Sequence, residues 1–391
     1  MSDAAVQPGP TRPPLPVSLA AFVSSFDRFA ISPLIVLVAA DLGATLTQAL
    51  TIASAYFLAY GISQPVWGVL SDKLGRLRLM KATLLAAAAA GVVATFAPTL
   101  TVLVIARALS GAFYGAIVPT SMTYVGDTVA EAHRQPALTD LMAAIAVGTA
   151  SATALAGVLA HFADWRIVFA IPVVLAIGCT GGLRRLSEPA REEQGGVIST
   201  IRAAVTNRWV LVVIGLAFVE GAVVLGVLTL LAPALQSQGV GAAIAGLATA
   251  AYGVGVIITS RMVKVLSRRL SMPRLMVIGG SATVIGFAAL TIHLSTLTVI
   301  IAALLLGATW SFQHSSLQTW ATAVLPRARG TVVALFAGCL FAGSALGTSV
   351  GGTLGDNDQW TLLFAITGLV ALVLTATIVI SRRTYAGPRR N

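Results

Sequence analysis

The sequence predicts an all-helical membrane protein with twelve spanning helices in two related six-helix bundles. Of 391 residues, 57% are hydrophobic and 10% are charged, against about 25% charged residues in an ordinary soluble domain. Two further observations support this fold: long apolar stretches follow one another along the chain, and most cations fall between alternate stretches. Because unsatisfied backbone groups in lipid exclude open sheets, the spanning element is expected to be the α-helix.

A spanning helix needs about 20 apolar residues, and twelve stretches of the sequence meet this requirement. Short polar or charged links separate them. Their approximate limits are 15 to 39, 46 to 70, 79 to 97, 99 to 125, 136 to 160, 165 to 185, 208 to 234, 241 to 266, 273 to 293, 296 to 324, 329 to 353 and 359 to 381.

The net charge of +11 does not indicate a nucleic-acid binder, because the cations lie on one side. With the N-terminus inside, 22 of the 25 Lys and Arg residues fall in loops and tails of that side. Arg166 lies on the other side, and Arg28 and Arg107 lie within spans. Positive charge in short loops marks the cytoplasmic side. We therefore expect a multi-pass protein of the cell (inner) membrane, surrounded by the lipid bilayer, with both termini in the cytoplasm.

The longest internal link divides the stretches into six and six. The N-terminal tail is polar and proline-rich, so we expect disorder there rather than a cleavable signal peptide. The expected parts are a cytoplasmic tail at 1–14, an N-terminal bundle at 15–186, a linker at 187–207, a C-terminal bundle at 208–381 and a tail at 382–391.

The two halves share a weak repeat. Residues 59–61, Ala-Tyr-Gly, recur at 251–253, and a basic turn at 68–80 recurs at 260–274 with Lys264 in place of Asp72. Such a repeat is expected when two six-helix halves are related by an axis along the membrane normal, with a substrate site between them. Chance similarity of short apolar strings is the alternative.

The turn at 68–80 carries a specific pattern, with Gly68, Leu70, Asp72, Gly75, Arg76 and Arg78 at fixed spacing. This pattern resembles the signature between the second and third helices of the major facilitator superfamily. A solvated turn with cations that stop translocation is the simpler interpretation. The resemblance covers nearly the whole chain and implies that Asp72 meets the start of the eleventh helix, near residues 330–331, while Arg76 meets Asp127. It thus implies a conformational latch between the halves, formed by Gly68, Asp72, Gly75, Arg76, Arg78 and Asp127.

Two charges inside spans fall at one depth. Asp27 lies about twelve residues into the first span and Arg107 about eight residues into the fourth, which places them about 18 Å and 12 Å from opposite faces. In a hydrocarbon core about 30 Å thick these depths coincide. We therefore expect Asp27 and Arg107 to pair directly or through water. Arg28 is an alternative partner for Asp27.

The resemblance assigns a role to this pair. Arg107, Gly111 and Gly115 resemble the fourth-helix signature of proton-linked superfamily members, in which the arginine serves the proton-coupling acid of the first helix. It implies that Asp27 carries the proton and that Arg107 tunes its proton affinity. A static ion pair joining the two helices is the alternative.

Glu220 lies at a similar depth in the seventh span. It is a candidate to carry a second proton or to bind a cationic substrate, and pairing with Arg28 is the alternative. His314 in the tenth span is a candidate for proton traffic, because histidine titrates near neutral pH, or a hydrogen-bonded core group. The candidate substrate-binding residues are Arg28, Tyr56, Tyr60, Tyr114, Glu220, Tyr252, Trp310, Gln313, His314 and Phe336.

The direction of transport rests on a further resemblance. Gly148, Gly157 and the pair Trp165-Arg166 match a fifth-helix signature of drug:proton antiporters, but Thr153 stands at its proline and Ala156 at one of its glycines. We expect a proton-coupled exporter of small amphipathic or cationic compounds such as drugs. A proton-linked importer or symporter of a metabolite is the first alternative, and a membrane sensor or scaffold the second.

The sequence indicates no enzyme. The four histidines have no metal-ligand spacing, and there is no phosphate-binding loop of the G-x-x-x-x-G-K type. We expect no metal and no cofactor. The expected partners are a small-molecule substrate, protons and the bilayer, with the chain acting as a monomer.

Overall fold

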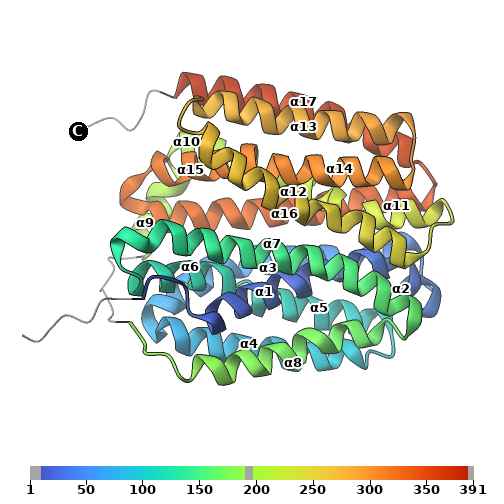
Figure 1. Ribbon diagram of the computed structural model, residues 1–391, viewed down its shortest axis with the longest axis horizontal. Helices are drawn as coiled ribbons and strands as arrows, with labels where there is room; N and C mark the ends of the chain where they lie inside the picture. The colour runs from blue at the N-terminus through green and yellow to red at the C-terminus, as the bar shows by residue number, and fades with distance from the viewer. Residues whose placement is uncertain (1–9, 190–196, 386–391) are drawn as a thin grey trace, which may run out of the picture.

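The computed structural model describes residues 10–189 and 197–385, with side chains omitted for 197–200, and every regular element in this part of the chain is helical. Figure 1 shows the helices running along one axis. The first half contains α1 (Leu15–Phe29), η1 (Ser32–Leu34), α2 (Ile35–Asp41), α3 (Leu46–Leu74), α4 (Arg76–Thr95), α5 (Leu100–Tyr114), α6 (Ile117–Thr128), α7 (Glu131–Phe162) and α8 (Arg166–Leu183). The all-helical fold class is therefore confirmed.

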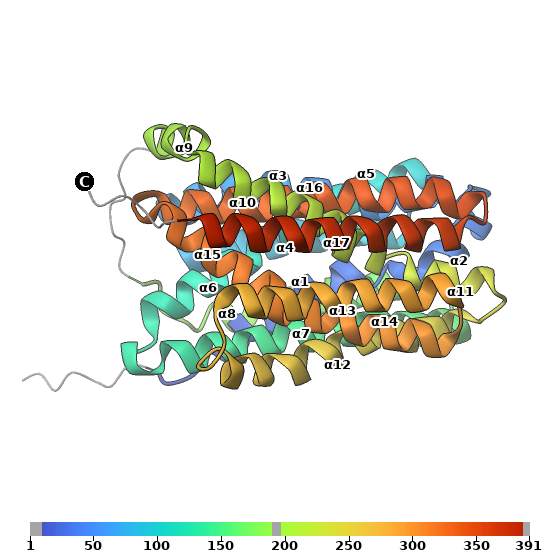
Figure 2. The ribbon, with the colours of Figure 1, turned by 90° about the horizontal axis from the view of Figure 1, so that it is seen from above.

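The second half follows the same plan after a short helix, α9, in the linker. Its elements are α9 (Val197–Val205), α10 (Arg208–Glu220), η2 (Gly221–Gly226), α11 (Leu231–Ser237), α12 (Ala242–Leu266), α13 (Met272–Ile292), α14 (Thr296–Thr309), η3 (Trp310–His314), α15 (Ser315–Val324), η4 (Pro326–Ala328), α16 (Arg329–Asp356) and α17 (Trp360–Thr384). In Figures 1 and 2, α1–α8 and α10–α17 gather into two neighbouring bundles.

The structure breaks several of the predicted spans without changing their order. The first span becomes α1, η1 and α2, because Pro33 lacks the N–H that a continuous helix needs. The seventh and tenth spans contain the π-helical turns η2 and η3. Eleven helical segments of the described chain are long and apolar enough to cross a membrane. The remaining predicted span is α3, whose 29 residues are long enough but include polar side chains such as Gln64.

Glycines allow the bundles to approach closely along two seams. In the first seam α3 packs on α16, and a Cβ on Gly61 would lie 2.8 Å from the carbonyl oxygen of Gly338. In the second seam α7 packs on α12, where a Cβ on Gly157 would press against the backbone of Ala242. Backbone contact of this kind is possible only where side chains are absent or small.

The basic end of the molecule is the end where α1 begins, α17 ends and the turn between α3 and α4 lies (Figure 1). At the opposite end, hydrogen bonds join the bundles. The Thr47 N–H donates to Asp356 at 3.0 Å, and Ser349 donates to Ser54 at 2.9 Å. Ser32 also donates to the Thr229 carbonyl at 2.8 Å. The interface is therefore closed toward this end.

Candidate functional site

Asp27 and Arg107 form a buried ion pair inside the first bundle. Arg107 Nη1 lies 2.6 Å from Asp27 Oδ1, and Nη2 donates to the Asp27 carbonyl oxygen at 2.6 Å. The two residues are 2% and 0% exposed. Asp27 Oδ2 has no hydrogen-bond partner among the residues that the structure describes. The pairing expected from equal depth is present in the structure, and it leaves one carboxylate oxygen available.

The position of Arg107 depends on a close crossing of α3 and α5. A Cβ on Gly111 would lie 2.5 Å from the Tyr56 carbonyl oxygen, so the helices meet backbone to backbone. The guanidinium carbon of Arg107 then lies 4.6 Å from the Tyr56 ring centroid and 5.0 Å from that of Phe169. Tyr114 is buried near the same pair, and its hydroxyl donates to the Pro172 carbonyl at 3.4 Å.

A second buried acid lies in the other bundle. Glu220 is fully buried, and its Oε2 lies 2.9 Å from His314 Nδ1. Gln313 Nε2 donates to Glu220 Oε1 at 3.4 Å, while Gln313 Oε1 accepts from Thr375 at 3.3 Å. The His314 ring stacks on Trp310 at a centroid distance of 3.7 Å, and Phe336 lies 5.6 Å away. Five of the candidate residues, Glu220, Trp310, Gln313, His314 and Phe336, thus lie in one cluster.

Both ends of the Glu220–His314 contact adjoin π-helical turns. Glu220 directly precedes η2, and His314 is the last residue of η3. Such turns are rare, and they occur often at functional sites because the wider turn shifts the direction of side chains. At η2 the backbone also touches α16, since a Cβ on Gly221 would press against the Leu340 carbonyl.

Arg28 lies between the bundles and forms no ion pair with any acid of residues 10–189 and 197–385. Its Nη2 donates to the Ser25 hydroxyl at 3.3 Å, and its guanidinium faces the rings of Tyr60, Phe341 and Phe29 at 4.6, 5.1 and 5.4 Å. The two pairings considered for it from sequence, with Asp27 and with Glu220, were wrong for this structure, because Arg107 and His314 occupy those carboxylates. Phe341 and Phe29 were not among the candidates, since isolated aromatics in apolar spans carry no distinguishing signal.

The two buried arginines, Arg107 and Arg28, differ in how far their contacts offset the cost of burying a charge. A cation over an aromatic ring gains about 0.5 to 1 kcal/mol at an exposed site and about 2 kcal/mol when desolvated. Removing a charge from water costs several kcal/mol per ion. Arg107 recovers this cost through its carboxylate, whereas Arg28 has only ring faces and one hydroxyl. Arg28 is therefore the less compensated of the two arginines buried in the described chain.

The turn between α3 and α4 is held by charge. Arg76 binds Asp72, and its Nε lies 3.2 Å from Asp127 Oδ2, a contact that the resemblance implied. The carboxylate of Glu188 accepts the backbone N–H groups of Leu77 at 3.0 Å and Arg78 at 3.2 Å. An acid at a helix N-terminus is stabilising, so the first residues of the linker cap α4. This cap was not expected from the sequence.

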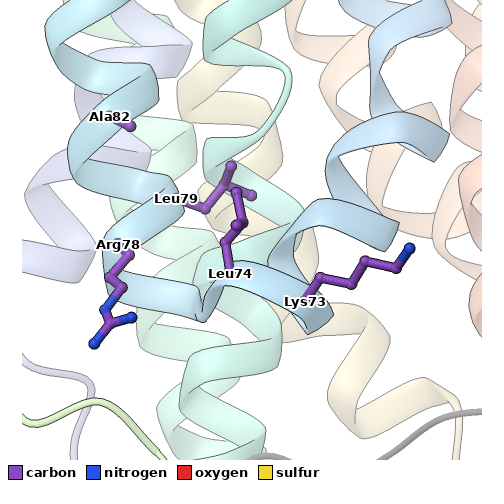
Figure 3. A pocket seen from close by; sticks show the side chains of 5 residues that line it. All are labelled: Lys73, Leu74, Arg78, Leu79 and Ala82. Carbon is purple, nitrogen blue, oxygen red and sulfur yellow. The ribbon is translucent and has the colours of Figure 1, made fainter.

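Gly75 is required at the turn for two reasons. Its φ of +101° is one that side-chain-bearing residues rarely adopt, and a Cβ would lie 2.8 Å from the Glu188 carboxyl carbon. Gly68, the other glycine of the pattern, has open space around it. A shallow pocket adjoins the turn, where Figure 3 shows Lys73 and Arg78 pointing apart. The contact between Asp72 and the start of α16 stays a prediction.

The Trp165-Arg166 pair has a structural place at the other end. Arg166 Nη1 lies 2.9 Å from Asp41 Oδ2, and the Trp165 indole donates to the same oxygen at 3.3 Å. These contacts fix the end of α2 to the start of α8. Tyr252, a candidate from sequence, is 5% exposed on α12, close enough to Arg28 and Glu220 for both charges to act on it.

Two related helical bundles with charged side chains buried inside them are typical of secondary transporters. Comparison with known proteins identifies the family. The model of the Major Facilitator Superfamily matches residues 17–241 and 222–391, so the chain belongs to this superfamily. It is a transporter rather than an enzyme.

The relatives include lipid and drug transporters. A triacylglyceride transporter of Mycolicibacterium smegmatis is 29% identical over 48% of this chain and 36% of its own length. The multidrug efflux pump LfrA of the same species is 30% identical over 46% and 36%. The matches thus span about a third of these relatives. The xylose transporter XylE of E. coli, solved in a partially occluded inward-open conformation, superposes with a TM-score of 0.77 at 14% identity over 97% of this chain and 98% of its own.

Proposed function

We propose that this chain is a proton-coupled antiporter that exports small amphipathic compounds by alternating access. The observation that carries the proposal is the buried Asp27–Arg107 pair with one free carboxylate oxygen. An acid at such depth is costly unless it has a function or a partner. Names of the relatives, a multidrug efflux pump and triacylglyceride transporters, support apolar or amphipathic cargo.

The proton binds at Asp27 Oδ2, the oxygen that Arg107 leaves free. The neighbouring cation favours the carboxylate, whereas desolvation favours the neutral acid. When water reaches the pair from one side the balance shifts toward ionisation, and closure of that side shifts it back. Asp27 therefore loads and releases a proton as the bundles alternate.

The two ends of the interface have different parts in this cycle. With the basic end in the cytoplasm, as the cation distribution predicts, the hydrogen bonds of Thr47 with Asp356 and of Ser54 with Ser349 close the outside. The turn with Asp72 and Arg76 lies at the basic end and closes that side in the alternate state. The predicted conformational latch and these hydrogen bonds thus act at opposite ends of the interface.

Glu220 is the candidate for a second proton rather than for a cationic substrate. His314 and Gln313 already bind both of its carboxylate oxygens. A cationic ligand would have to displace them, while a proton can be shared between the carboxylate and the imidazole. Cargo recognition is therefore assigned to the interface between the bundles.

Flux in proteoliposomes under an imposed pH gradient tests the proposal. A panel of cationic, neutral and anionic amphiphiles is loaded, and substrate and proton movements are recorded together. Opposite movement of substrate and protons is expected. Asp140, an exposed acid on α7, provides the matched control: Asp27→Asn should abolish coupling, and Asp140→Asn should not.

A proton-linked importer is the rival on the same fold. It would use the same pair, but substrate and proton would move in the same direction. The direction of proton movement relative to substrate movement in this experiment decides between the exporter and the importer. Flux that is indifferent to the gradient in the wild type would contradict both.

A further inference from the structure

Arg28 is a buried cation whose hydrogen-bonding capacity is largely unused. It is 8% exposed, and its Nε has no hydrogen-bond partner in the described part of the chain. The nearest acid in sequence, Asp27, is bound to Arg107, and Glu220 of the other bundle is bound to His314. The guanidinium therefore keeps its charge and at least one free donor inside the protein.

Both bundles contribute to the surroundings of Arg28. Tyr60 and Phe29 belong to the first bundle, and Phe341 belongs to α16 of the second. Gly61 of α3 and Gly338 of α16 cross next to them. An apolar wall with one convergent charged donor is typical of a small-molecule site. Its position on the seam means that alternation of the bundles changes its exposure.

We propose that Arg28 binds the anionic headgroup of the substrate, a carboxylate or sulfate whose apolar part lies against the neighbouring aromatic rings. The planar guanidinium presents parallel N–H donors that match the oxygens of such a group. A cationic headgroup would meet an uncompensated like charge and leave the free donor unpaired. This inference rests on the proposed transport function and names the chemical class of its substrate.

Three probes with the same eight-carbon tail test the charge preference: octyl sulfate, octan-1-ol and octylammonium. Binding is measured on the purified full chain in lipid nanodiscs. Octyl sulfate should bind at least about tenfold more tightly than octylammonium, because only the anion gains charge-assisted hydrogen bonds. Equal or tighter binding of octylammonium overturns the proposal.

Variants of Arg28 test whether this residue causes the preference for octyl sulfate over octylammonium. Arg28→Gln should remove it, and Arg28→Lys should keep part of it, because lysine keeps the charge but not the planar fork. Arg268→Gln, at an exposed arginine, should leave it unchanged. If Arg28→Gln retains the wild-type preference, the proposal is wrong. If Arg28→Gln does not fold, Arg28→Lys is compared with the wild type instead. An affinity and a preference for octyl sulfate equal to those of the wild type would then contradict the proposed role of the planar guanidinium.

Binding in nanodiscs and flux in proteoliposomes together separate the two proposals. Proton-driven flux without any preference for octyl sulfate overturns the anion site alone. A preference for octyl sulfate without proton-driven flux of any amphiphile overturns the proposed coupling alone.

Discussion

The two bundles bury their acids in different ways. In the first, Asp27 faces Arg107, a guanidinium that does not lose its proton in proteins. In the second, Glu220 faces His314, a residue type that titrates near neutral pH. The first pair therefore changes charge only at the acid. The second pair has a group on either side that can accept a proton. At similar depth and with similar burial, the two acids therefore have chemically different partners.

The backbone that carries the two charge pairs also differs between the bundles. Asp27 and Arg107 lie on regular α-helices, α1 and α5, whereas Glu220 and His314 each adjoin a π-helical turn. A π-helical turn is less favourable than a regular one and persists only where packing holds it. The first site is thus built on regular α-helix, and the second lies at two π-helical turns.

The largest expected effect is on flux. Asp27→Asn should reduce proton-driven transport to the level of protein-free liposomes, since no other group of its pair can carry the proton. Glu220→Gln should only reduce the rate, because His314 remains. Flux and thermal unfolding of both variants are measured together. Complete loss in both would remove the contrast between the sites, provided that both variants fold.

The second effect is on stability. Removing one partner of a buried ion pair costs about 3 to 5 kcal/mol, so Arg107→Ala should be strongly destabilised. His314→Ala loses a hydrogen bond to a charged group, worth about 1.5 to 3 kcal/mol. Reversible unfolding in mixed micelles measures both. If His314→Ala lowered the free energy of unfolding more than Arg107→Ala does, the second pair would contribute more to stability than the first, contrary to this expectation.

The third effect concerns the π-helical turn itself. Gly221→Ala would place a methyl group against the Leu340 carbonyl, and overpacking of this kind costs about 1 to 3 kcal/mol. Gly215 on α10 has open space around it. Gly215→Ala should therefore be neutral or stabilising, because alanine is the better helix former. Equal unfolding midpoints for the two variants would show that the close crossing at η2 is dispensable.

The smallest effect lies at the turns, where the halves also differ. The first copy has Asp72 and the second has Lys264. An acid at a helix N-terminus contributes about 0.3 to 1 kcal/mol, so Asp72→Asn should shift the population of the two open states by about two- to fivefold. Accessibility of cysteine labels at the basic end reports the shift. Lys264→Gln should leave labelling unchanged, and an equal response to both substitutions would contradict an asymmetric latch.

Much of the fold could be predicted from the sequence, because apolar length and alternation of cations fix where helices cross a bilayer. The pairing of Asp27 with Arg107 followed from counting residues along straight helices. The contact between Glu220 and His314 was not predicted, because it forms only when the seventh and tenth spans pack together. The aromatic surroundings of Arg28 were only partly predicted, since Phe341 becomes significant only when α16 packs on α3.

The cap that Glu188 provides to α4 shortens the length of chain that connects the two bundles. Because that carboxylate is bound at the basic turn, the chain between the capped turn and the start of α9 at Val197 consists of only the residues from Glu188 onward. Each residue of an extended chain spans at most about 3.3 to 3.6 Å, so these residues reach about 30 Å. The linker thus sets an upper limit on how far the basic ends can separate, and releasing Glu188 would lengthen that tether.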